Sequence, residues 1–242
     1  MTKLTFLGHS SFKLEHESTT IYLDPWFNGP TYPEEEKSIP DNSILLVSHG
    51  HFDHFETAFD LVKKQQIKVV SNFDMMVWMN LQGIPQEKTI GMNKGGCISI
   101  SDNITIHMVP AEHSSTIQHE GKLLPGGEPV GYVIQIGSSK SLYYAGDTSV
   151  FSDMRLITEF YKPDIAILPV GGLFTMAGNQ VAYALDNFLT SVKIVIPSHY
   201  GTFDFLSNKP EEVIKTVKRN VDFKICASGE SIDLEKIIPS IY

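Results

Sequence analysis

Three histidines and an aspartate lie within six residues, directly after a short apolar run: His49, His51, Asp53 and His54. The apolar run, Ile44–Val47, predicts a buried strand, so the cluster stands where the chain leaves a sheet. In extended backbone, residues i and i+2 point to the same side, which lets the first two imidazoles bind one ion. If the chain then turns into a helix that begins near Glu56, the other two groups face a second ion. A solvated polar turn explains the cluster poorly, because its groups would repel one another on protonation.

Length and patterning predict one α/β domain. The chain has 242 residues and 42% hydrophobic content, enough to bury a large core, and no linker divides it, so we expect a single domain over residues 1–242. Apolar runs predict strands at Lys3–Leu7, Phe12–Glu15, Thr20–Leu23, Ile44–Val47, Ile67–Val70, Ile104–Val109, Gly131–Ile136, Ser141–Ala145, Ile165–Val170, Ile194–Pro197 and Phe223–Ala227. Helical patterns are found at Glu56–Gln66, Phe73–Leu81, Ser152–Tyr161, Asn179–Leu189 and Pro210–Asn220. The polar stretch Asn28–Asn42 is either a lid or an unimportant excursion.

Charge and cysteine usage narrow the partners and the compartment. The 28 acidic residues against 19 basic ones give a net charge of −9, which repels phosphate backbones, so we expect no nucleic-acid partner. The apolar runs are too short to span a membrane. Cys97 and Cys226 are far apart and form no CxxC pair, which fits a reducing compartment, and we expect the protein in the cytoplasm.

Further metal-binding side chains follow three other predicted strands. His113 comes after Ile104–Val109, His199 after Ile194–Pro197, and Asp147 after a strand that ends in Gly146, where the glycine permits a sharp turn. The chain has a weak internal sequence similarity: Ile44–His49 resembles Ile194–His199, and Ile21–Asp24 resembles Leu142–Asp147. Two related halves that both send ligands into one cleft would explain this pattern.

Together these motifs resemble the metallo-β-lactamase superfamily, over nearly the whole chain. H-x-H-x-D-H, a later histidine, Gly-Asp and a final histidine follow its order, and segments such as Gly8–Phe12, Asp24–Trp26 and His199–Thr202 resemble its small metal-dependent hydrolases, similar to L-ascorbate-6-phosphate lactonases. The resemblance implies an α/β fold, a four-layer αββα sandwich, with a binuclear site at its edge. Pro110–Ser114 and Gly171–Leu173 depart from the common pattern, so the family's choice of substrate is not carried over to this chain.

The resemblance also implies a role for each ligand. One ion is held by His49, His51 and His113, the other by Asp53, His54 and His199, and Asp147 bridges them. Asp24 steadies the ligand loop, or else caps a turn beside Pro25. These donors suit zinc first, with manganese or iron as alternatives.

Three further residues are candidate substrate contacts: His9, Tyr200 and Thr202. His9 either contacts substrate or a metal-bound water, or only fixes its own turn. Glu112 is either an extra hydrogen-bond partner or simply exposed, and His16, His107 and His119 fit no ligand spacing. Phe174–Met176 either packs or lines the cleft.

We therefore expect a hydrolase in which metal-bound hydroxide attacks a small ester, lactone or phosphoester, with Asp53 relaying a proton and Asp147 as the second catalytic carboxylate. Three alternatives stay open: a metal-dependent nuclease, an oxygen- or redox-active di-iron protein, and a non-catalytic metal-binding protein. The partner would be a small-molecule substrate, and the resemblance to lactonases implies that copies of the chain can form a homo-oligomer.

Overall fold

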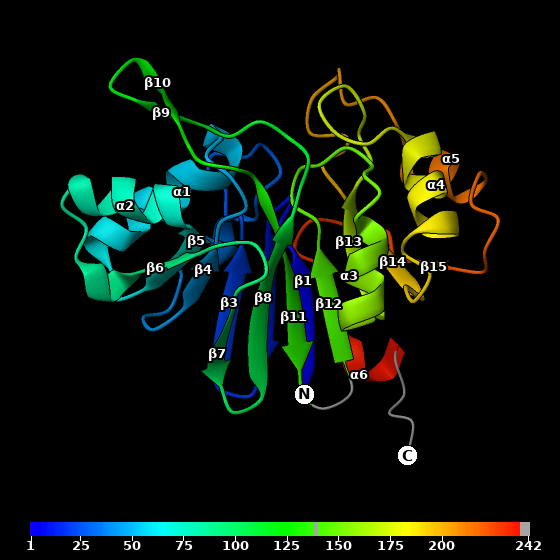
Figure 1. Ribbon diagram of the computed structural model, residues 1–242, viewed down its shortest axis with the longest axis horizontal. Helices are drawn as coiled ribbons and strands as arrows, with labels where there is room; N and C mark the ends of the chain where they lie inside the picture. Colours follow the sequence, from blue (N-terminus) through cyan, green and yellow to red (C-terminus); the bar gives the residue numbers. More distant parts are fainter. Residues whose placement is uncertain (138–139, 238–242) are drawn as a thin grey trace. The chain divides into compact units, whose positions relative to one another are not determined.

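The computed structural model describes residues 1–137 and 140–237 and divides into two compact units that are interleaved in sequence (Figure 1). The first unit comprises Met1–Asn93, Ser114–Pro129 and the described residues 227–237. The second comprises Lys94–His113 and Val130–Cys226. The prediction of one domain stays a prediction, and each unit is described by itself.

The first unit contains a seven-stranded sheet in the order β16-β1-β2-β3-β4-β5-β6. Its strands are β1 (Thr2–Phe6), β2 (Phe12–His16), β3 (Thr19–Leu23), β4 (Ile44–Leu46), β5 (Lys68–Asn72), β6 (Thr89–Met92) and β16 (Ser231–Asp233). Its helices are α1 (Phe52–Lys64), α2 (Phe73–Leu81), α6 (Leu234–Ile237) and two 3-10 turns, η1 (Glu34–Glu36) and η2 (Gln86–Lys88). A separate hairpin is formed by β9 (Thr116–His119) and β10 (Lys122–Pro125).

The second unit contains another seven-stranded sheet, in the order β15-β14-β13-β12-β11-β8-β7. Its strands are β7 (Cys97–Ser101), β8 (Ile104–Pro110), β11 (Val130–Ile136), β12 (Lys140–Tyr144), β13 (Ile165–Pro169), β14 (Ile194–Ser198) and β15 (Asp222–Phe223). Its helices are α3 (Met154–Tyr161), α4 (Gly178–Asn187) and α5 (Pro210–Ile214).

Both sheets follow one pairing scheme. Read from β16 to β6 and from β7 to β15, three antiparallel pairings are followed by three parallel ones. The carboxyl ends of parallel strands meet at one edge of a sheet, and in α/β proteins that edge carries the ligand-binding residues. In the first unit Asp24 and His49 follow such strands, and in the second unit Asp147 and His199 do.

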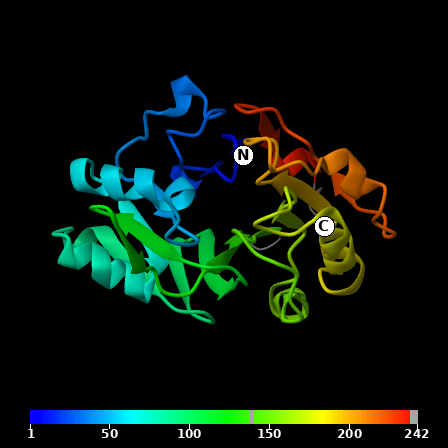
Figure 2. The same cartoon turned by 90° about the horizontal axis from the view of Figure 1, so that it is seen from above.

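Helix α1 packs its apolar face on the first sheet. Its buried residues recur every three or four positions, and they include His54 as well as Phe55, Ala58, Leu61 and Val62, as expected of an amphipathic helix. Figure 2 shows α1 in cyan with the green β9–β10 hairpin beside it, and the two elements are in contact. In the second unit α4 lies against α5, and Val181, Ala184 and Leu185 of α4 are buried in that unit's core.

The stretch 28–42 is anchored to the first unit. Tyr32 and Ile39 belong to its hydrophobic core, and Lys13 Nζ lies 2.7 Å from Glu36 Oε1. Within residues 1–137 and 140–237, no helix is both long enough and apolar enough to cross a bilayer.

Three predicted boundaries differ from the structure by more than two residues. Helix α1 begins at Phe52, not near Glu56, because His51 takes an extended backbone and its carbonyl accepts from the N–H groups of His54 and Phe55. Asp53 and His54 therefore lie in the first helical turn, where the helix dipole stabilises an acidic side chain.

The helix predicted for Pro210–Asn220 ends at Ile214. The N–H groups of Lys218 and Arg219 donate to the Asp186 carboxylate of α4, at 3.1 Å each to Oδ1, instead of to helical carbonyls. The strand predicted for Phe223–Ala227 is confined to Asp222–Phe223, because the chain passes from the second unit into the first at Ala227.

Candidate metal centre

Asp24 organises the first unit's cluster from its buried position after β3. Its carboxylate accepts hydrogen bonds from the N–H of Ser48, at 2.7 Å, and from the hydroxyl of Ser48. The same carboxylate lies 2.6 Å from Nδ1 of His54, and both side chains are fully buried. A carboxylate that contacts Nδ1 fixes the ring orientation and leaves the other nitrogen, Nε2, to coordinate a metal ion.

Three imidazoles converge beside this carboxylate. His49 Nε2 lies 2.9 Å from His51 Nδ1, and the His49 ring centroid lies 4.5 Å from that of His51 and 4.2 Å from that of His54. One ligand atom from each of Asp24, His49 and His54 falls within 4.8 Å of the others. Imidazoles packed this closely repel when protonated, whereas neutral imidazoles and carboxylates are the donors that borderline divalent ions prefer. The donor set therefore fits a divalent metal ion.

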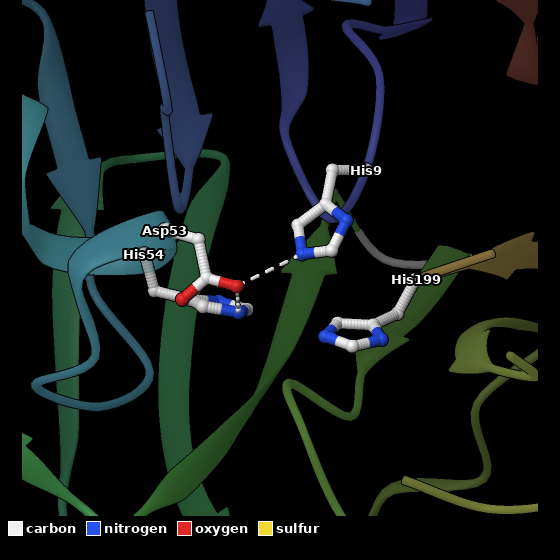
Figure 3. Close-up of side chains that lie close together, drawn as sticks. All are labelled: His9, Asp53, His54 and His199. Carbon is white, nitrogen blue, oxygen red and sulfur yellow. Dashed lines mark hydrogen bonds and ion pairs between the residues drawn. The ribbon is translucent and has the colours of Figure 1, made fainter. Parts of the chain in front are cut away.

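His9 contacts the same cluster through Asp53. Its Nε2 lies 3.1 Å from Asp53 Oδ2, and the Asp53 oxygen lies 3.8 Å from His54 Nε2 (Figure 3). The His9 ring also contacts Trp26, with centroids 5.2 Å apart. His9 thus does more than fix its own turn: it holds the carboxylate on the first turn of α1. Figure 3 also labels His199, which belongs to the second unit.

The second unit brings its own three candidates together around one carboxylate. Asp147 Oδ2 lies 3.0 Å from Nε2 of His199 and 3.7 Å from Nε2 of His113. Asp147 and His199 are nearly fully buried. Two imidazoles directed at one carboxylate make the same kind of donor set as in the first unit.

The backbone at these strand ends is unusual. His9, Asp24 and His199 all have left-handed φ angles, of 53°, 40° and 54°, which non-glycine residues adopt at some energetic cost and most often at functional sites. Gly146, directly before Asp147, has a φ of 61°, which confirms the predicted sharp turn. Gly171 lies against the His199 carbonyl oxygen so closely that a Cβ atom could not be placed there.

Tyr200 and Thr202 follow His199 on a half-exposed loop. Burial raises the pKa of Tyr200 to about 12, with smaller contributions from the nearby Cys226 and Glu211, so its phenol keeps its proton at neutral pH. The Thr202 hydroxyl donates to the Tyr200 carbonyl at 3.4 Å. The Tyr200 ring packs against the second unit's hydrophobic core, and contact of either side chain with substrate stays a prediction.

The candidate metal-binding loop, residues 48–54, is positioned by Ser48 and Ser115, and the sequence did not reveal either role. Ser48 Oγ lies 2.9 Å from His49 Nδ1, and Ser115 Oγ accepts from the Gly50 N–H at 3.1 Å. The sequence offered one signal for these roles: each serine lies within two residues of a predicted metal ligand, Ser48 next to His49 and Ser115 near His113.

The other residues that the sequence analysis considered lie in ordinary surface or packing environments. Glu112 is exposed, which agrees with the second of its two interpretations, a simply exposed side chain. His16 lies 2.9 Å from the Thr2 hydroxyl and His107 2.9 Å from Gln135 Oε1. His119 packs on the ring of Trp78, with centroids 5.1 Å apart. Met176 is fully buried, whereas Phe174 is exposed.

Comparisons with known proteins give this geometry a family. A model of the β-lactamase superfamily domain matches residues 19–200. A UPF0173 metal-dependent hydrolase of Koribacter versatilis is 41% identical over 218 residues, which cover 89% of this chain and 91% of that protein. A UPF0173 metal-dependent hydrolase of Nanoarchaeum equitans is 39% identical over 96% of this chain and 100% of that protein.

The solved structures agree. A novel metallo hydrolase of the hyperthermophilic archaeon Ignicoccus hospitalis matches with a TM-score of 0.82 and 30% identity, over 96% of this chain and 97% of that chain. The predicted metallo-β-lactamase fold, of class α/β, is therefore confirmed, and so is the prediction of a metal-dependent hydrolase. The chain belongs to the β-lactamase superfamily and, within it, to the UPF0173 metal-dependent hydrolases.

Proposed function

We propose that this hydrolase holds two divalent ions, zinc before manganese or iron, and cleaves a small ester, lactone or phosphoester. The observation that carries the proposal is the pair of clusters in which imidazoles surround a carboxylate at strand ends, one cluster in each unit. The ligands are His49, His51 and His113 for one ion, and Asp53, His54 and His199 for the other, with Asp147 shared. Such ions supply, when bound, a water of lowered pKa and a positive charge that stabilises an oxyanion.

The chain's own residues carry the remaining steps. Asp53 is the proton carrier: its side chain is 13% exposed, so it has an outlet to solvent, and His9 at 3.1 Å holds it in place. Tyr200 keeps its proton and can donate a hydrogen bond to a substrate oxygen from its place next to His199, and Thr202 can do the same. Asp24 orients the His54 ring without touching the substrate.

A small-molecule substrate suits the net charge of −9, which disfavours a nucleic-acid backbone. Cys97 and Cys226 form no disulfide bond with each other, as suits a protein of the reducing cytoplasm.

The test is elemental analysis of purified protein followed by a panel of esters, lactones and phosphodiesters with each metal. We expect about two ions per chain and turnover that is lost on chelation and restored by zinc. His51→Ala and Asp147→Asn should each lower the metal content and abolish turnover. Full activity in a metal-free preparation would sink the proposal, and hydrolysis confined to RNA would move it to a nuclease.

A further inference from the structure

The first unit contains a cavity of about 280 Å³ between α1 and the β9–β10 hairpin. Its walls are aromatic. The ring centroids of Phe59 and Trp78 are 4.8 Å apart, those of Trp78 and His119 are 5.1 Å apart, and those of Phe59 and His119 are 5.8 Å apart. Phe55 packs behind them, 5.8 Å from Trp78. Rings from three elements, α1, α2 and β9, therefore line one small space.

Carboxylates surround these rings. Glu56 and Asp60 of α1 and Glu120 of the hairpin line the same cavity and are exposed to solvent. Lys63 is the one lysine or arginine among the described residues that line it, so the fixed charges there sum to a negative value. A negative potential over aromatic faces favours a cation.

An ammonium group already occupies one of the ring faces. Lys63 Nζ lies 3.6 Å from the centroid of the Phe59 ring and 4.0 Å from Asp60 Oδ1. This distance is well inside the range for a cation–π contact. The Lys63 side chain is 38% exposed, and its long flexible stem lets the ammonium move into solvent. The protein's own side chain thus shows which chemistry the ring face accepts.

The cavity adjoins the metal-binding loop within the same unit. Gly50 and Phe52, the neighbours of His51, both line it. A group bound in the cavity would therefore contact the two residues that flank His51, a proposed metal ligand.

We propose that this cavity binds an organic ammonium group, which takes the place of the Lys63 ammonium over the Phe59 ring. As a further step, which rests on the proposed function, the bound group is the cationic end of the substrate, and the bond to be cleaved lies toward His51. The substrate class is then a small ester or lactone that carries an alkylammonium substituent.

Calorimetric titration with choline and with its uncharged isostere 3,3-dimethylbutan-1-ol tests the binding. We expect choline to bind at least tenfold more tightly than the alcohol. Asp60→Asn and Glu56→Gln should each weaken choline binding at least threefold, and Lys63→Gln should strengthen it. Glu87→Gln is the matched control, since Glu87 is an exposed acid of the same unit that lies outside the cavity. Equal affinity for the two probes, or no binding of choline, would overturn the inference.

Hydrolysis tests the further step separately. The zinc-loaded enzyme should cleave acetylcholine with a kcat/KM at least tenfold higher than 3,3-dimethylbutyl acetate, and Asp60→Asn should reduce that ratio. Choline binding without this preference would refute the substrate role and leave the binding site standing. Failure to cleave any ester would count against the proposed function, whereas the calorimetry decides on the cavity by itself.

Discussion

Asp24 shows how one buried carboxylate can position the donors of a candidate metal site. It receives two hydrogen bonds from Ser48 and lies 2.6 Å from His54 Nδ1. Ser48 in turn lies 2.9 Å from His49 Nδ1. The Nδ1 atoms of two imidazoles are therefore held by a single buried pair of side chains, which fixes the orientation of both rings.

Asp24→Asn should weaken metal binding while the fold persists. The amide keeps the shape of the side chain but places an N–H donor where an acceptor is needed, so the orientation of the His54 ring is lost. Loss of such a supporting group costs about 10- to 100-fold in metal affinity. Zinc competition against a chromophoric chelator measures it.

Asp41→Asn is the control for that change, because Asp41 is an exposed aspartate that only accepts the Gln66 N–H. Ser48→Ala, which keeps the carboxylate and removes one hydroxyl donor, should give a smaller loss than Asp24→Asn. Unchanged zinc affinity in Asp24→Asn would show that the carboxylate does not orient the imidazole.

At the scale of elements, the candidate metal-binding loop lies close against strand β9 because Gly50 has no side chain. A Cβ atom at Gly50 would lie 2.9 Å from Ile117 Cγ1 and 3.2 Å from the Thr116 carbonyl oxygen. Both distances are tighter than ordinary packing, and the second involves backbone that cannot rotate away.

Gly50→Ala should therefore push β9 and the loop apart by a few tenths of an ångström. Small displacements of catalytic groups are costly, and we expect kcat/KM to fall about tenfold with little change in circular dichroism. Gly121→Asn, at a hairpin position with a φ of 73° and open space around it, should behave like the wild type. An equal loss in both variants would mean that hairpin disorder, not loop displacement, limits the rate.

The end of helix α4 depends on the guanidinium of Arg219. Its Nη1 donates to the carbonyls of Leu185 and Leu189 at 2.9 and 3.1 Å. Its Nη2 donates to those of Thr190 and Val192 at 2.8 and 3.1 Å. The last carbonyls of a helix lack intrahelical partners. The planar cation binds one of them, that of Leu185, and three carbonyls of the chain that follows α4, and so ties the helix end to that segment.

Arg219→Ala should lower the free energy of unfolding by about 2 kcal/mol, since hydrogen bonds to a charged group are lost and carbonyls lose their partner. Urea unfolding followed by circular dichroism measures it. The chain's other arginine, Arg155, makes an exposed pair with Glu159 at 3.4 Å, and Arg155→Ala should cost under about 0.5 kcal/mol. Equal effects of the two changes would contradict the capping role.

The elements themselves were largely predictable where apolar runs were long. The predicted helix Phe73–Leu81 matches α2 at both ends, and strands β2, β4, β8 and β13 begin where the apolar pattern begins. The strands β9 and β10 were missed because Gln118, His119 and Lys122 interrupt any apolar alternation. Strand β9 contacts α1, which is distant from it in sequence, and β10 pairs with β9.

The internal sequence similarity agrees with the strand order for one of its two pairs of segments. Asp24 and Asp147 follow β3 and β12, each the fourth strand in its sheet's pairing scheme. His49 and His199 do not correspond, since they follow β4 and β14, the fifth and sixth strands. Sequence likeness of strand ends reflects the shared chemistry of a metal donor as well as shared topology.

At the scale of the whole molecule, sequence could name the donors but not their partners. A donor at a strand end is visible as a polar residue after an apolar run. That His9 would contact Asp53, 44 positions away, depends on the sheet order, which follows from long-range pairing. Their roles as metal ligands stay predictions that elemental analysis decides.

Buried tyrosines in both units make the whole molecule sensitive to alkali. Burial raises the pKa of Tyr32 and of Tyr143 above their usual range. Unfolded tyrosine ionises near pH 10. Below that pH both states hold the proton and stability is unaffected. As the pH rises further, only the unfolded state loses protons, so the free energy of unfolding falls.

Tyr143→Phe isolates this effect, because Tyr143 is fully buried and its hydroxyl has no hydrogen-bond partner among the residues described. At pH 7 the change should be neutral or slightly stabilising. Between pH 10 and 11 the decline in unfolding free energy should become shallower by about 1 kcal/mol, because the unfolded tyrosine goes from half to almost fully ionised over that range. Tyr183→Phe, at a half-exposed ring, should retain the wild-type slope. Urea unfolding at each pH decides, and identical slopes in all three proteins would show that Tyr143 ionises before the chain unfolds.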